Sequence, residues 1–196
     1  KQEKSFYLWS GVHQHHFQTG KRNFFTEWND AFTEQYVSGE VCRSEQQNSL
    51  VHFFESKKDD TVSVIAPTSY GKSELILSAV KEYAGKNICV LTSTKALLIQ
   101  TKKRVQQISK GIFPKIVVHP EMYNPNDSSC LAVLTQERLL RIFKKDPQLS
   151  FDCIIVDEAH EMLEDDSRSR TLANVIIVAQ NRNPEVAFKF LAPFLA

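Results

Sequence analysis

Short apolar segments that alternate with segments of helical periodicity constrain the fold of this 196-residue chain more than any other feature. The apolar segments are rich in Val, Ile and Leu, as in strands buried on both faces of a parallel sheet. Strand–helix alternation predicts βαβ units, and therefore an α/β fold with a mostly parallel sheet between two layers of helices. The predicted strands are residues 61–66, 87–92, 115–119, 131–134, 151–156 and 186–191. The predicted helices are residues 44–55, 71–83, 95–109, 137–144 and 168–180.

The composition is that of an ordinary globular protein, with 42% apolar and 24% charged residues. Basic and acidic side chains number 24 and 23, so no chain-wide positive charge indicates a nucleic-acid partner by itself. No apolar stretch reaches the roughly 18 residues that cross a bilayer, and we expect no membrane partner. The four cysteines include no CxxC pair. We therefore expect buried free thiols and a reducing, cytoplasmic location rather than disulfides or a zinc site.

The first 40 residues differ from the rest in their many aromatic side chains. Aromatic residues recur at helical spacing over residues 24–36, which predicts a helix there. We predict an N-terminal appendage at residues 1–40, packed on a main domain at residues 41–196. The cluster His13–His16 has no accompanying cysteine or carboxylate set, so a solvated or packed segment is favoured over a metal site. The chain begins with Lys1 rather than Met, and we expect it to be a fragment of a longer protein.

A loop of sequence Ala66-Pro-Thr-Ser-Tyr-Gly-Lys-Ser73 joins the first predicted strand to the next helix. Backbone N–H groups of such a loop can surround phosphates at a helix N-terminus. Gly71 allows a tight turn, Lys72 places a positive charge on the β- and γ-phosphates, and the Ser73 hydroxyl can bind Mg²⁺. Ala66 replaces the first glycine of the usual pattern, and a turn that only caps a helix is the alternative. The residues predicted to bind phosphate are Pro67, Thr68, Ser69, Tyr70, Gly71, Lys72 and Ser73.

Two adjacent carboxylates follow the fifth predicted strand, in the segment Cys153–His160. Asp157 is predicted to hold Mg²⁺ through water, and Glu158 is predicted to activate the attacking water as a general base. His160 is the third predicted catalytic residue after the strand, placed to link the nucleotide site to a facing domain. A solvated loop is the alternative. We expect the pair and the phosphate loop to lie on neighbouring strand ends, at the edge where parallel sheets bind ligands.

Together the two motifs resemble motifs I and II of superfamily 2 helicases of the DEAD/DEAH-box type, with Asp157-Glu-Ala-His160 as the box itself. The resemblance covers residues 44–196. It implies a RecA-like P-loop NTPase with three layers, which hydrolyses ATP with Mg²⁺ and grips a DNA or RNA strand. It also implies a second RecA-like domain in the full-length chain, which would supply arginine residues to the nucleotide. The isolated fragment is therefore expected to be weak or inactive as an ATPase.

Two weaker motifs extend the resemblance. Gln46 lies in a segment that resembles the family's adenine-reading element, although the adjacent Gln47 or a plain surface glutamine are alternatives. The segment 93–100 resembles motif Ia, with serine in place of proline. The resemblance implies that Thr94 and Lys95 contact the phosphates of a nucleic-acid strand at a helix N-terminus. A plain helix cap is the alternative there.

The segment Thr135-Gln-Glu-Arg138 resembles motif Ib, with glutamine in place of proline. The resemblance implies that Thr135 and Arg138 contact the strand backbone, and a helix start with a solvated arginine is the alternative. Residues 168–172 resemble an R-G-x-x-L-E stretch whose role we leave open. Residues 191–195 stand where the family carries S-A-T, which couples hydrolysis to strand movement, but they contain no hydroxyl. A remodelling ATPase that does not unwind, or a nucleotide-gated interaction module, is therefore an alternative to a helicase.

Overall fold

The computed structural model describes residues 37–38, 41–42, 45–67, 70–164 and 166–193. The chain divides into two compact units, Lys1–Asn48 and Ser49–Ala196. In the first unit, β1 (Val37–Ser38) and β2 (Val41–Cys42) form an antiparallel pair. The helix predicted over residues 24–36 and the cluster His13–His16 lie outside the described residues, so these predictions and the proposed appendage stay untested.

The second unit is built on a six-stranded sheet in which every described strand pair is parallel. The strand order is β3-β8-β7-β4-β6-β5. This confirms the predicted α/β class and makes the sheet wholly parallel. The strands are β3 (Val62–Ile65), β4 (Ile88–Leu91), β5 (Ile116–Val117), β6 (Leu131–Leu134), β7 (Cys153–Asp157) and β8 (Ala187–Ala192). The helices are α3 (Glu45–Ser56), α4 (Lys72–Glu82), α5 (Lys95–Ser109), α6 (Gln136–Lys145) and α7 (Ser167–Arg182), with short 3₁₀ segments η1 (Pro120–Met122) and η2 (Ala159–Leu163).

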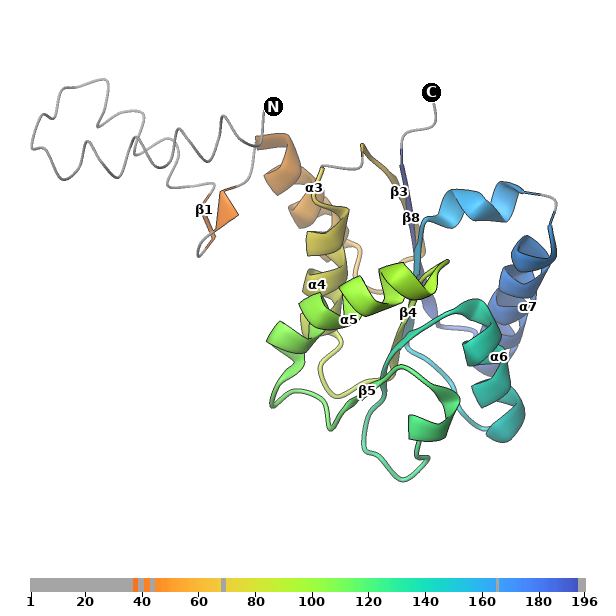
Figure 1. Ribbon diagram of the computed structural model, residues 1–196. Helices are drawn as coiled ribbons and strands as arrows, with labels where there is room; N and C mark the ends of the chain where they lie inside the picture. Colours follow the sequence, from red (N-terminus) through yellow and green to blue (C-terminus); the bar gives the residue numbers. More distant parts are fainter. Residues whose placement is uncertain (1–36, 39–40, 43–44, 68–69, 165, 194–196) are drawn as a thin grey trace, which may run out of the picture. The chain divides into compact units, whose positions relative to one another are not determined.

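Successive residues of the central strands face two different helical layers. Val90 of β4 and Ile155 of β7 belong to the core that also contains side chains of α4 and α5. Their neighbours Leu91 and Val156 belong to the core that contains side chains of α6 and α7. Figure 1 shows the two pairs of helices on opposite sides of the sheet. The predicted three-layer architecture is therefore confirmed, and burial on both faces explains why these strands are continuously apolar.

Strand β3 departs from the prediction of a buried strand. It lies at the edge of the sheet, where β8 is its partner among the described strands. Val64 is 4% exposed, whereas Ile65 is 65% exposed. The prediction of a strand over residues 61–66 was right in position and wrong in burial, because β-branched residues favour a strand without distinguishing its centre from the sheet's edge.

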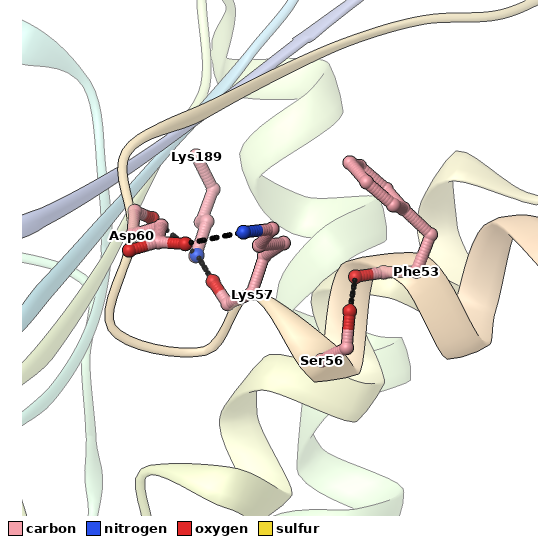
Figure 2. Close-up of polar contacts among 5 residues, drawn as sticks. All are labelled: Phe53, Ser56, Lys57, Asp60 and Lys189. Atoms are coloured by element: carbon pink, nitrogen blue, oxygen red, sulfur yellow. Dashed lines mark hydrogen bonds and ion pairs between the residues drawn. The ribbon is translucent and has the colours of Figure 1, made fainter.

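Lys189 of β8 is a buried charge that ties the sheet to the end of α3. Its side chain is 1% exposed, and its Nζ atom donates hydrogen bonds to the backbone carbonyls of Lys57 and, at 2.6 Å, Asp60 (Figure 2). The ammonium also lies 5.4 Å from the centre of the Phe54 ring. Burial lowers the pKa of Lys189 below its usual value. These contacts anchor β8 beside the helix that precedes the phosphate loop.

Replacing Lys189 by Met should lower the free energy of unfolding by about 2 kcal/mol, because two carbonyls lose a charged donor while the apolar stem keeps its packing. The matched control is Lys57→Ala, which removes the exposed Lys57–Asp60 ion pair (3.1 Å) but leaves the Lys57 carbonyl in place. The control should cost at most about 1 kcal/mol. Urea denaturation measures both variants, and equal losses would contradict the anchoring role.

Candidate nucleotide-binding site

The loop after β3 and the acidic pair after β7 lie at the same edge of the sheet. Ile65 of β3 is level with Ala192 of β8, and Asp157 of β7 is level with Leu191 of β8. The expectation of neighbouring strands was wrong, because β8 runs between the two. Strands two places apart are separated by about 10 Å. That distance still allows side chains from both strand ends to converge on one triphosphate.

Gly71 and Lys72 form the junction between the loop and α4. Gly71 has φ 87°, a left-handed conformation that glycine adopts without strain. A Cβ at this position would meet no atom within 4 Å, so the backbone conformation rather than space requires glycine. Lys72 is 7% exposed, and its Nζ atom donates to the Ala66 carbonyl at 2.8 Å. The hydrogen bond of the lysine amine therefore joins the end of the loop to its beginning.

The remaining loop residues contribute a turn and one unexpected contact. The Tyr70 N–H donates to the Pro67 carbonyl at 3.0 Å, while Thr68 and Ser69 lie outside the described residues. The hydroxyl of Ser73, the predicted Mg²⁺ ligand, accepts a hydrogen bond from the guanidinium of an arginine at position 104 in α5. Sequence reasoning missed this arginine, because no motif includes it.

Asp157 and Glu158 are held in an unusual conformation at the end of β7. Glu158 has φ 56° and is the one non-glycine residue with positive φ among those that the structure describes. A left-handed conformation costs such a residue about 1–2 kcal/mol, and strain of this kind concentrates at functional sites. Burial and the charge of Glu158 raise the pKa of Asp157, whereas the Glu158 N–H, Lys72 and Arg104 oppose the rise. The charges of the loop lysine and the α5 arginine thus favour the ionised form of Asp157.

His160 lies beside the predicted general base. Its Nδ1 atom is 3.4 Å from Oε2 of Glu158, and the two side chains are 27% and 25% exposed. The Nδ1 atom is buried and makes no hydrogen bond of good geometry. The imidazole therefore lies beside the Glu158 carboxylate without a hydrogen bond to it, and its predicted link to a facing domain stays a prediction.

The donor groups at this edge suit Mg²⁺. The Ser73 hydroxyl and the Asp157 carboxylate are hard oxygen donors, the type that Mg²⁺ prefers. The Ser73 hydroxyl already accepts a hydrogen bond from the positively charged Arg104. Within the described ranges no group of three or more His, Cys, Asp or Glu side chains could hold a metal. A bound Mg²⁺ would therefore take most of its ligands from phosphate and water, which is its usual behaviour.

A sequence model of the family described as DEAD/DEAH box helicase matches residues 43–189, a span that contains both motifs. This chain belongs to the DEAD/DEAH box helicase family. Members of the family are, in general, ATPase motors that act on nucleic acid and use ATP with Mg²⁺. A search of curated proteins found no match to the chain. In the part of the chain that the structure describes, no helix has the length and apolar character to span a membrane.

The predicted strand-binding motifs of this helicase domain begin two helices at one sheet edge. Strands β4 and β6 pair with Leu91 level with Leu134, so α5 and α6 follow neighbouring strands at the same edge and then cover opposite faces of the sheet. The Thr94 hydroxyl accepts the Leu97 N–H at 3.2 Å, so Thr94 caps α5. Lys95 is exposed. The cap is present in the structure, and a phosphate contact by the exposed lysine stays a prediction.

The motif at the start of α6 is more firmly tied into the domain. Thr135 is 8% exposed, and its side chain makes no capping hydrogen bond. The Arg138 guanidinium donates to the Val118 carbonyl at 2.7 Å, so this arginine is not simply solvated. Their contacts with a nucleic-acid strand stay predictions.

A pocket lies between these helix starts and the acidic pair. Its lining includes Thr92, Gln136, Glu158, Arg168 and Leu172. Thr92 is 1% exposed, and its Oγ1 atom has no hydrogen-bond partner, which is unusual for a buried hydroxyl. The segment 168–172, whose role the sequence left open, therefore forms part of the wall beside the DEAH box.

The segment in the place of the family's S-A-T triplet ends β8. Leu191 pairs with Asp157, and the Ala192 carbonyl accepts the Ala66 N–H at 3.1 Å. This segment consequently contacts the phosphate-loop strand on one side and the DEAH strand on the other, with no hydroxyl of its own.

The predicted adenine-reading element lies in the first turn of α3. Gln46 is exposed and Gln47 is half-buried. Both belong to the first compact unit, and the choice between them stays a prediction.

Proposed function

We propose that this chain is the first motor domain of an ATP-dependent helicase or translocase. ATP would bind at the edge where β3 and β7 end, facing a second RecA-like domain of the same full-length protein. One observation carries the proposal: the strand that leads into the loop of Lys72 and the strand that ends in Asp157 flank β8 and finish at the same edge of the sheet. A lysine and two carboxylates around one triphosphate are the groups that phosphoryl transfer to water requires.

Each residue has a distinct task in this proposal. Lys72 binds the β- and γ-phosphate oxygens, and Glu158 accepts the proton of the attacking water. His160 orients Glu158 from 3.4 Å. Mg²⁺ held by Ser73 and Asp157 would neutralise charge on the phosphate oxygens. The second domain would add arginine charges, so this domain tested on its own is expected to turn over slowly.

The direct test is the ATPase activity of the full-length protein with single-stranded DNA, duplex DNA and RNA compared side by side. A motor should be stimulated by at least one of them, and the strongest stimulation identifies its track. Activity that no nucleic acid changes would refute the motor.

A remodelling ATPase without unwinding is the second candidate. It is favoured by the segment at Leu191–Pro193, which lies between both motifs yet offers no hydroxyl. A strand-displacement assay separates the two: stimulated ATPase without displacement of a paired strand supports remodelling. Nucleotide-dependent docking without turnover would instead support a gated interaction module.

Lys95→Ala should weaken binding of the full-length protein to its preferred nucleic acid by about three- to tenfold. The slope of log affinity against log salt concentration should become shallower by about 1, the value for one lost phosphate contact. The reason is that Lys95 is exposed at the N-terminus of α5, where a phosphate is favoured. Lys103→Ala, exposed further along the same helix, removes the same charge and should have little effect. Fluorescence anisotropy across a salt series measures both, and similar slopes for the two variants would argue against this contact.

We also place the protein in the cytoplasm. Cys89, Cys130 and Cys153 are free and buried, as expected in a reducing compartment. Fractionation of cells that express the full-length protein tests this, and recovery from an oxidising compartment would refute it.

A further inference from the structure

Arg104 of α5 contacts the Ser73 hydroxyl, one of the two groups proposed to hold the metal. Helix α5 packs against α4, and its buried side chains include Thr101 and Val105. Arg104 is adjacent to Val105 and reaches the first turn of α4, where its guanidinium donates to the Ser73 hydroxyl. Its charge also acts on the Asp157 carboxylate. A permanent positive charge therefore occupies an oxygen donor of the phosphate loop, on the side of the domain where the DEAH box also lies.

A guanidinium and a divalent cation interfere with each other at such a place. Arginine keeps its charge at any physiological pH, so it cannot yield by losing a proton. Two positive groups a few ångströms apart repel each other even in a water-like medium, by an amount that corresponds to about tenfold or more in binding. Arg104 is exposed along most of its length, which allows its side chain to swing away without disturbing the buried face of α5.

We propose that Arg104 is a built-in competitor of Mg²⁺, which occupies the Ser73 hydroxyl until a metal–nucleotide complex displaces it. The inference rests on the proposed nucleotide site and adds a residue that sets how much Mg²⁺ the site requires. Lys72 differs from Arg104 in this respect, because its amine is buried and bonded to the Ala66 carbonyl rather than to a metal-binding oxygen.

The test is a Mg²⁺ titration of fluorescent ADP binding to the full-length protein. Arg104→Ala should lower the Mg²⁺ concentration for half-maximal nucleotide binding by about three- to tenfold. Arg104→Gln keeps a hydrogen-bond donor for Ser73 without the charge, and it should behave like the alanine variant. Lys103→Ala is the matched control, since it removes the same charge from the neighbouring exposed position and should leave the midpoint unchanged.

Thermal melting separates competition from a merely structural role. Without metal and nucleotide, Arg104→Ala should melt below the wild type, because the Ser73 hydroxyl loses its hydrogen-bond donor and Asp157 loses a favourable charge. With saturating Mg²⁺ and ADP the difference should disappear, whereas a structural role would lower both melting temperatures alike. If the wild type binds Mg–ADP but Arg104→Ala shows an unchanged or higher Mg²⁺ midpoint, the inference is overturned while the proposed function stands. A wild type that binds no nucleotide would overturn the proposed function and the inference with it.

Discussion

Lys72→Ala in the full-length protein is expected to lose ATP affinity by at least about 100-fold. The Lys72 amine is 7% exposed and already folded over the loop, so it can reach the phosphates without a large rearrangement. Two charge-assisted hydrogen bonds to phosphate oxygens contribute about 3 kcal/mol or more, which corresponds to that loss. Equilibrium binding of a fluorescent ATP analogue measures it.

The matched control for this variant is Lys81→Ala, at the exposed end of the same helix. It removes an equal charge far from the loop and should bind nucleotide like the wild type. Because Lys72 is buried, circular dichroism should accompany the binding data to verify that the alanine variant is folded. A folded Lys72→Ala protein that keeps its ATP affinity would refute the phosphate-binding role.

Glu158→Gln is expected to retain nucleotide binding while strand-stimulated turnover falls by about 100- to 10,000-fold, the usual contribution of a general base. Glutamine has nearly the same size as glutamate, and a left-handed backbone at φ 56° costs both residues about the same free energy, so the fold should not change. Single-turnover hydrolysis beside nucleotide binding separates the chemical step from affinity.

Glu164→Gln provides the control, because Glu164 is an exposed carboxylate just after η2. It should hydrolyse ATP at the wild-type rate. If the Glu158 variant keeps strand-stimulated activity, the proton must go to another group and the assignment of the base is wrong.

Local patterns were sufficient to predict the elements that form the candidate site. The phosphate loop and the DEAH box are each contiguous, and the strand before each is marked by β-branched residues. The predicted helix over 95–109 and strand over 131–134 match α5 and β6 in full. The alternation of strands and helices was likewise sufficient for the layer architecture.

The spatial order of strands was not predictable in the same way. Strand β8 comes last in the sequence, yet it inserts between β3 and β7 and separates the two motifs. The spacing of residues along the sequence does not indicate which strands become neighbours in the sheet. For the same reason the edge position of β3, and with it the exposure of Ile65, could not be derived from an apolar run alone.

Arg104 was missed because its role depends on tertiary packing. It lies 31 residues from Ser73, on a helix whose pattern predicts only which side is buried. Lys189 is a similar case. Its burial could not be predicted from the sequence of the strand, because its hydrogen-bond acceptors are the carbonyls of Lys57 and Asp60, which lie far away in the chain.

The backbone at Glu158 has a consequence for anyone who would engineer this domain. Asparagine and glycine tolerate a left-handed backbone better than glutamate does. Laboratory selection that rewards only resistance to heat will therefore favour replacing this glutamate, and will yield a more stable protein without its proposed base. Selection for robustness in this domain needs a simultaneous requirement for ATP turnover.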